Sequence, residues 1–142
     1  MNDVMALLLS DTYKQCHDRM YPKGLTKLVS YWVPRRSMLK HQDKMVFFGL
    51  QAFIKEYLIG YFNDNFFGKM EEDVVSQYKE TMNIQIGDGN YDIDKIVQLH
   101  RLGYLPLEIR ALPEGTMVTM GIPCIEITNT HENFAWFPKF YL

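Results

Sequence analysis

Cysteine is scarce in this sequence. Its 142 residues include two cysteines, Cys16 and Cys124, which lie far apart and form no CxxC pair. Neither a disulfide framework nor a cysteine-based zinc site is therefore indicated. An excess of one charge is also missing, because 15 Lys and Arg face 17 Asp and Glu, for a formal net charge of −2. Proteins that bind the phosphate backbone usually carry a basic excess, so we expect no nucleic-acid partner.

Long apolar runs are absent as well. The longest covers residues 4–9, far fewer than the roughly 18 residues that a membrane-spanning helix requires. Asp3 precedes this run and no small-residue cleavage pattern follows it, which differs from a secretory signal. We therefore expect a cytoplasmic protein that has no membrane partner.

Apolar side chains are nevertheless abundant. Hydrophobic residues make up 47% of the sequence, aromatic residues 14% and charged residues 23%. A chain of this composition can bury a core, which excludes a disordered protein. Its length predicts one domain over residues 1–142.

Apolar residues at three- and four-residue spacing, together with capping residues, predict helices over residues 12–20, 43–62, 71–82 and 92–101. Asp11 is expected to cap the first of these helices and Asp92 the last. Gly103 is expected to end the last helix.

β-Branched and aromatic segments predict strands over residues 26–33, 107–111, 116–119 and 124–128. We expect the first strand to pair with the later ones in one mainly antiparallel sheet. A basic cluster follows the first strand and is predicted to be a loop: Arg35, Arg36, Lys40, His41 and Lys44. Together these elements predict an α+β fold, with helices packed on a mainly antiparallel sheet.

The last residues, FAWFPKFYL, are unusually aromatic. Trp136, Phe137, Phe140 and Tyr141 have no obvious cover in so small a domain, so we expect them to be exposed as an apolar patch. On this interpretation the chain is interrupted and continues in a further domain.

No catalytic constellation is complete. The sequence has no glycine-rich phosphate loop, no metal-spaced set of His and Cys residues and no nucleophile elbow. The four histidines are scattered over different predicted elements, so none is assigned as a catalytic base. Composition and spacing by themselves predict no reaction.

Four segments closely resemble, in order and spacing, the N-terminal region of the nicotinamide phosphoribosyltransferase family. They are SDTYKQCH at residues 10–17, SYWVPRR at 30–36, VFFGLQ at 46–51 and LPLEIRALPEG at 105–115. The later segment GIPCIEITNTHENFAWFPKFYL is similar to that family's strand and the start of its next helix. The resemblance covers nearly the whole chain and implies the N-terminal α+β domain of a type II phosphoribosyltransferase.

The resemblance implies an enzyme that transfers the phosphoribosyl group of phosphoribosyl pyrophosphate to nicotinamide. The products are nicotinamide mononucleotide and pyrophosphate, in the salvage route to NAD. Enzymes of this family are homodimers, and they use phosphoribosyl pyrophosphate with Mg²⁺ in an α/β-barrel portion that would follow Leu142. The resemblance therefore implies that this chain binds no cofactor alone and is inactive alone.

By the same resemblance, Asp11 and Tyr13 reach into the active site of the other subunit, where the tyrosine ring stacks on nicotinamide. The residues alone suggest an N-cap for Asp11 and a helix-surface aromatic packed on its own core for Tyr13. Arg35 matches an arginine that approaches the pyrophosphate. Because Pro34 precedes it and Arg36 follows it, either arginine is a candidate. The alternative for both is a solvated basic turn.

Two other functions are open. A nicotinate phosphoribosyltransferase fragment would carry a similar Asp-x-Tyr segment, and the residues that select amide over carboxylate are expected outside this chain. A non-catalytic dimerisation or regulatory module would use the aromatic C-terminal segment as an interface.

Overall fold

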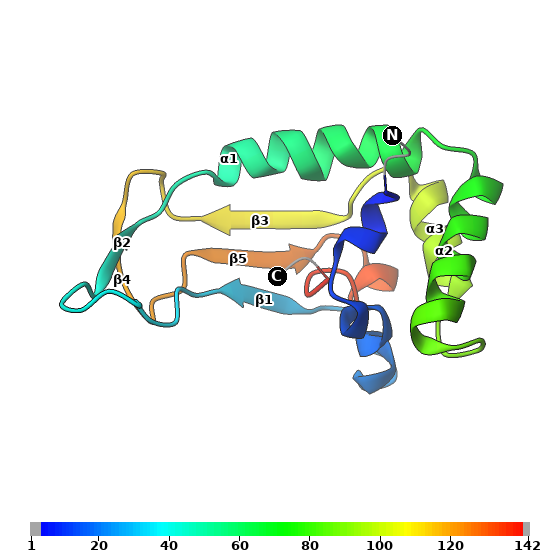
Figure 1. The fold of residues 1–142 in the computed structure, drawn as a ribbon, viewed down its shortest axis with the longest axis horizontal. Helices are drawn as coiled ribbons and strands as arrows, with labels where there is room; N and C mark the ends of the chain where they lie inside the picture. Colours follow the sequence, from blue (N-terminus) through cyan, green and yellow to red (C-terminus); the bar gives the residue numbers. More distant parts are fainter. Residues whose placement is uncertain (1–3, 141–142) are drawn as a thin grey trace. The chain divides into compact units, whose positions relative to one another are not determined.

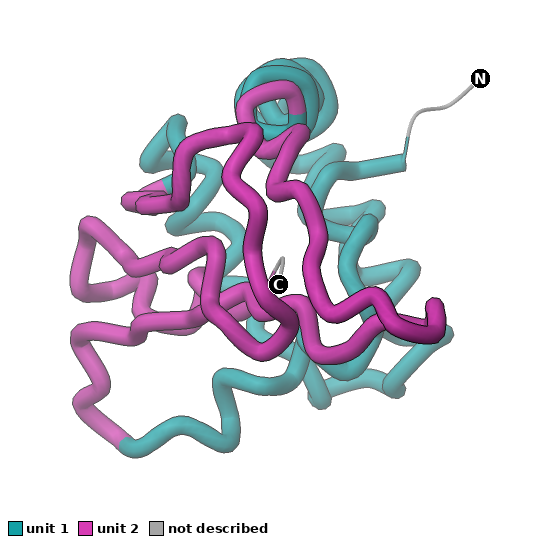
Figure 2. The backbone as a smooth tube through the Cα atoms, turned by 90° about the vertical axis from the view of Figure 1, so that its left-hand side faces the viewer, with its two compact units in different colours: residues 1–22, 53–105 teal, residues 23–52, 106–142 magenta. Residues whose placement is uncertain are grey.

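The computed structural model describes residues 4–140, and the chain divides into two compact units (Figure 2). The first unit contains Met1–Pro22 and Phe53–Leu105, and the second contains Lys23–Ala52 and Pro106–Leu142. Each unit therefore combines segments that are distant in the sequence. No helix within residues 4–140 is both long enough and apolar enough to cross a membrane.

The second unit contains an antiparallel sheet in the order β1-β5-β3 (Figure 1). Its strands are β1 (Val29–Trp32), β3 (Leu107–Ala111) and β5 (Ile125–Asn129). The predicted pairing of the first strand with later segments is confirmed, because β1 pairs with β5. The α+β fold is confirmed as well.

A separate two-stranded sheet joins β2 (Lys44–Val46) to β4 (Met117–Thr119). The expectation of one sheet is therefore incomplete, since β4 pairs with β2 and not with the three-stranded sheet. Phe47, Val118 and Cys124 are buried together beside these strands. This apolar cluster covers a hairpin-sized sheet that would be marginal alone.

The helix predicted from residue 43 starts instead at α1 (Leu50–Phe53). Gly49 has a φ of +96°, a left-handed conformation that interrupts a helix and that glycine adopts without strain. The residues before Gly49 are thus free to form β2. The predicted start was wrong because the apolar spacing alone does not reveal this break.

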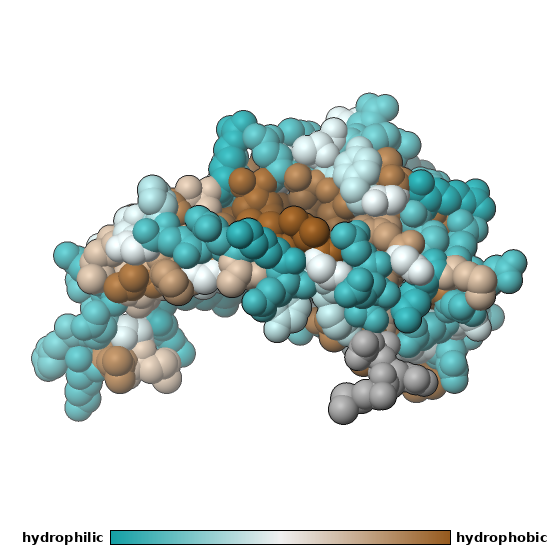
Figure 3. Space-filling model, turned by 90° about the horizontal axis from the view of Figure 1, so that it is seen from above, coloured by the Kyte–Doolittle hydropathy of each residue, from teal (hydrophilic) through white to brown (hydrophobic). Residues whose placement is uncertain are grey.

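After α1 the helix continues as π-helical turns over Ile54–Tyr61 and Asn63–Phe67. It ends at Gly68, where a Cβ would lie 2.6 Å from the Asn63 carbonyl oxygen, so glycine is required there. Three apolar side chains of this helix are exposed: Phe53, Tyr57 and Ile59. On the face of the molecule that Figure 3 shows, hydrophobic and hydrophilic side chains lie beside one another.

The first unit is completed by α2 (Glu71–Ile86) and α3 (Ile93–Leu102). The apolar stripe predicted on α2 is buried, and it consists of Val74, Tyr78 and Met82. The predicted ends of α3 are confirmed: the Asp94 N–H donates to Asp92 Oδ1 at 3.0 Å, and Gly103 is left-handed with φ +76°. The two helices are joined by the two-pronged ion pair of Arg101 with Glu71, at 2.7 and 2.8 Å.

Two 3₁₀ helices precede these elements, at Ala6–Leu9 and Thr12–Met20. The second forms where a helix was predicted, but the Asp11 side chain does not cap it. Its backbone carbonyl accepts from the Lys14 N–H at 3.0 Å, and its carboxylate lies 3.4 Å from the Lys14 Nζ. The capping prediction was wrong because a backbone bond three residues apart already closes this first turn.

The predicted exposure of the last aromatic residues is wrong for Phe137 and Phe140, which are 1% and 4% exposed. Trp136 is half-buried, and Tyr141 lies outside the described residues. The Phe137 and Phe140 rings stack with their centroids 5.6 Å apart. The Trp136 ring meets the Phe137 ring edge-on, with a centroid distance of 5.2 Å. Consecutive turns fold the segment so that its rings cover one another, which a linear pattern does not reveal. Because Phe137 and Phe140 are buried, they do not support the expectation that the chain is interrupted.

Candidate functional site

Asp11 and Tyr13 lie at the start of the 3₁₀ helix Thr12–Met20 in the first unit. Tyr13 is 59% exposed, so its ring does not pack into the buried core. Its one ring contact within the described residues is with His17: the two ring centroids are 4.9 Å apart, and the ring planes are inclined at 59°. This arrangement leaves aromatic surface available to stack on a flat ligand.

Polar contacts hold the 3₁₀ helix against the rest of the first unit. Thr12 Oγ1 donates to Gln85 Oε1 of α2 at 3.1 Å. At the other end, the Arg19 guanidinium donates to the Gly89 carbonyl at 2.9 Å. Asp18 pairs with Lys95 of α3. The segment that carries Tyr13 is thus attached at both ends to α2, to α3 and to the turn between them.

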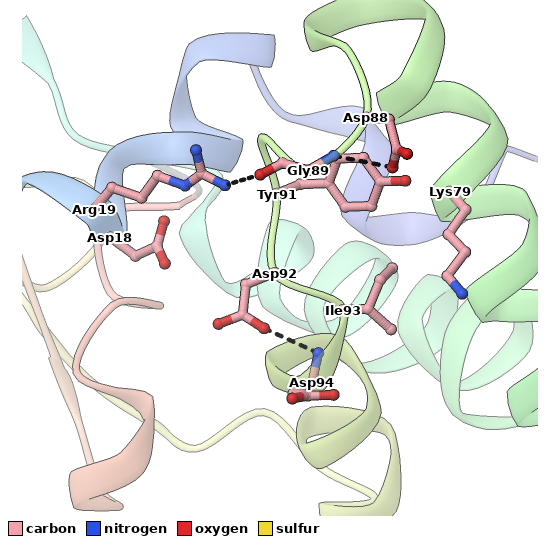
Figure 4. A pocket seen from close by; sticks show the side chains of 9 residues that line it. All are labelled: Asp18, Arg19, Lys79, Asp88, Gly89, Tyr91, Asp92, Ile93 and Asp94. Carbon is pink, nitrogen blue, oxygen red and sulfur yellow. Dashed lines mark hydrogen bonds between the residues drawn. The ribbon is translucent and has the colours of Figure 1, made fainter.

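A shallow cavity of about 440 Å³ opens beside this attachment (Figure 4). Its charged lining residues are Asp18, Asp88, Asp92, Asp94, Arg19 and Lys79. The carboxylates outnumber the cations, which disfavours an anion such as pyrophosphate. Asp88 also accepts from the Gly89 N–H at 2.9 Å, and Asp92 caps α3. Tyr13 does not line this cavity. The cavity is best explained by the way in which the turn between α2 and α3 packs against the 3₁₀ helix.

Arg35 and Arg36 lie in the second unit, in the loop after β1, and both side chains are exposed. The loop is fixed at its start, where the Gly121 N–H donates to the Pro34 carbonyl at 2.7 Å. Within residues 4–140 neither guanidinium forms an ion pair, so both are available to an anion. The predicted basic loop is confirmed except at Lys44, which begins β2.

Metal binding has no visible basis in the described part of the chain. Across residues 4–140, no group of three or more His, Cys, Asp or Glu side chains is placed to hold a metal ion.

One polar cluster went unnoticed in the sequence. On one face of the three-stranded sheet, Arg110 Nη2 lies 2.7 Å from Glu108 Oε1. Tyr31 donates to the Glu126 carboxylate, which raises the pKa of the tyrosine. Tyr31, Glu126 and Arg110 are neighbours across β1, β5 and β3. Only the strand register brings them together, so no signal in the linear sequence could have identified them.

Tyr78 also acquires a distinct environment. It is 2% exposed, and burial raises the pKa of its phenol well above the ordinary value of 10.0. Its hydroxyl donates to the Gln15 Oε1 at 3.0 Å. The buried phenol must therefore remain neutral for the native state to be stable.

The raised pKa of Tyr78 predicts a loss of stability in alkali. The contribution of the neutral Tyr78 phenol to the free energy of unfolding is complete below the unfolded-state pKa of 10.0. This contribution falls as the pH rises from 10.0 toward the higher folded-state pKa, because in that range the unfolded chain releases the phenol proton readily and the folded chain does not. Urea unfolding at about pH 8 and about pH 11 should show a smaller alkaline loss for Tyr78→Phe than for the wild type. Tyr104→Phe, at an exposed tyrosine, is the control and should keep the full loss. An equal loss in Tyr78→Phe and the wild type would contradict the assignment.

Comparison with known proteins adds a family context to this geometry. Residues 5–109 match the family described as the nicotinamide phosphoribosyltransferase N-terminal domain. The nicotinamide phosphoribosyltransferase of Acinetobacter baylyi (strain ATCC 33305 / BD413 / ADP1) is 42% identical over 135 residues. That alignment covers 92% of this chain and 27% of the relative, so the chain spans about a quarter of the relative's length. Asp11, Tyr13, Arg35 and Arg36 all fall within the matched range.

Proposed function

Because this chain belongs to the nicotinamide phosphoribosyltransferase N-terminal domain family, we propose that it is the N-terminal part of an enzyme that makes nicotinamide mononucleotide. The reaction transfers the phosphoribosyl group of phosphoribosyl pyrophosphate to nicotinamide and releases pyrophosphate, which serves the salvage of NAD. The observation that carries this proposal is the exposed ring of Tyr13 on a firmly attached segment within the matched range.

Tyr13 would bind nicotinamide by stacking. Nicotinamide is flat and neutral, and offset aromatic contact orients such a ring without requiring a charge. The ring nitrogen is then held toward the anomeric carbon of phosphoribosyl pyrophosphate, which favours attack. Since 59% of the Tyr13 side chain is exposed, other walls of this site must come from outside the 3₁₀ helix. A homodimer in which Tyr13 and Asp11 enter the partner's site would provide them.

Arg35 or Arg36 would act on the leaving group. As the ring nitrogen bonds to the anomeric carbon, the bond from that carbon to the pyrophosphate oxygen breaks and its electron pair leaves with the pyrophosphate. A guanidinium matches the geometry of phosphate oxygens and stabilises the negative charge that develops there. Both arginines are exposed on an anchored loop and free of carboxylate partners within residues 4–140. We assign no part of Mg²⁺ binding to this chain.

A chimera tests the proposal directly. This chain is joined to the portion of the Acinetobacter baylyi relative that follows the region of similarity. We expect the chimera to use nicotinamide as its substrate. Of the two variants Arg35→Ala and Arg36→Ala, the one that removes the arginine in contact with pyrophosphate should lower kcat/KM for phosphoribosyl pyrophosphate by about 10- to 100-fold. The KM for nicotinamide should change much less, because the guanidinium contacts only the phosphate groups.

Lys40→Ala is the matched control, since Lys40 is an exposed cation of the same loop with no assigned contact. An equal loss of kcat/KM in Lys40→Ala would show that the loop acts by general electrostatic attraction and not through a specific arginine contact. A chimera that prefers nicotinate to nicotinamide would show that the chain comes from a nicotinate phosphoribosyltransferase. A folded but inactive chimera would favour a non-catalytic module.

A further inference from the structure

A buried amide lies within the segment that carries Tyr13. Gln15 is 7% exposed, although it is only two residues from the largely exposed Tyr13. Its Nε2 donates to the Leu7 carbonyl at 2.9 Å and to Ser10 Oγ at 2.7 Å. Its Oε1 accepts from the Tyr78 hydroxyl at 3.0 Å. Gln15 thus bonds both to the chain that precedes Tyr13 and to α2.

A glutamine is a costly choice for this position if burial is its only purpose. Burying an amide loses its bonds to water, whereas methionine would fill a similar volume without that loss. What the amide adds is direction, because its donors and its acceptor must each face their own partners. The partner on α2 is fixed as well, since Tyr78 is 2% exposed and lies between the buried Val74 and Met82 on the same helix face.

The local geometry converts this anchoring into a direction for Tyr13. A 3₁₀ helix has about three residues per turn, so side chains two residues apart point about 120° away from each other. When Gln15 is held inward, Tyr13 is held outward. Rotation of the 3₁₀ helix about its axis would break the bonds of Gln15 before it could turn the Tyr13 ring away.

We propose that Gln15 and Tyr78 form a positioning pair that fixes the direction in which Tyr13 is presented to nicotinamide. The inference rests on the proposed function for its ligand, but the anchoring itself does not. Thr12 makes a comparable contact with α2, through Gln85, yet that bond is exposed to water and should matter less.

The first test measures amide hydrogen exchange in the 142-residue chain. Gln15→Met keeps the side-chain volume and removes all three bonds, and we expect exchange across residues 11–17 to accelerate about tenfold. Tyr78→Phe, which removes a single hydroxyl, should give a smaller acceleration and covers the case in which Gln15→Met folds poorly. Thr12→Val, the control at the exposed contact, should change exchange little. Unchanged exchange in both Gln15→Met and Tyr78→Phe would overturn the anchoring.

The second test measures kinetics in the chimera. We expect Gln15→Met to raise the KM for nicotinamide about three- to tenfold, with little change in the KM for phosphoribosyl pyrophosphate. In a Tyr13→Ala background the same substitution should add almost nothing, because it acts through Tyr13. An additive effect, or an equal loss for both substrates, would overturn the positioning role. An inactive chimera would contradict the proposed function, while the exchange result would still decide whether Gln15 anchors the segment.

Discussion

Replacing Phe137 with alanine should lower the free energy of unfolding by about 3–5 kcal/mol. Phe137 is 1% exposed, stacks on Phe140 and meets Trp136 edge-on, so the truncation would leave a cavity that its neighbours fill only in part. Urea denaturation followed by far-UV circular dichroism measures the difference. A loss this large would show that the aromatic C-terminal segment belongs to the folded core.

Phe48→Ala is the matched control, because Phe48 lies in the same unit and is 78% exposed. Its effect should stay within about 0.5 kcal/mol. If the two variants lose similar stability, or if Phe137→Ala is as stable as the wild type, Phe137 does not lie in the core and the segment regains its interpretation as an uncovered surface.

The second large effect is expected at Tyr13. In the chimera, Tyr13→Ala should lower kcat/KM for nicotinamide on the order of 100-fold, because the substitution would remove both the proposed stacking and the proposed apolar contact with the substrate. Stability should change little because the side chain is 59% exposed. Initial rates over a range of nicotinamide concentrations provide the measurement.

Tyr13→Phe retains the aromatic ring and should stay within about threefold of the wild type. A comparable loss in Tyr13→Phe would assign the effect to the hydroxyl and not to stacking. Wild-type kinetics in Tyr13→Ala would remove Tyr13 from the substrate site altogether.

The parts of the fold that could be predicted are those with a local cause. The apolar stripe of α2, the Asp92 cap and the Gly103 terminus of α3 depend on residues within a few positions of one another. The pairing of β1 with later strands also followed from β-type segments and turns. These features need no knowledge of the tertiary structure.

The parts that could not be predicted depend on contacts between distant residues or on backbone angles. The left-handed Gly49 separates β2 from α1, although the apolar spacing runs through both. The pairing of β2 with β4 joins residues about 70 positions apart, which no periodicity reveals. The rings of Phe137 and Phe140 become buried only when the turns between them fold.

The candidate site divides in the same way. The Asp-x-Tyr segment and the Arg35–Arg36 pair could be proposed from a resemblance, and the structure adds their exposure and their attachment. The Gln15–Tyr78 bond could not be proposed, because it joins residues 63 positions apart and neither residue type is diagnostic. Polar anchors of this kind become visible only once burial and distance are known.

The central claim, that Tyr13 serves a site in the partner subunit, is tested most directly by mixing subunits of the chimera. One subunit carries both Tyr13→Ala and an inactivating substitution in the portion supplied by the relative, and its partner is wild type. If Tyr13 acts in the partner's site, each of the two sites contains one lesion, so purified heterodimers should have almost no activity. With the two lesions on different subunits, one intact site and about half the activity should remain. About half the activity in the first pairing would contradict the claim, because it would place Tyr13 in the site of its own subunit.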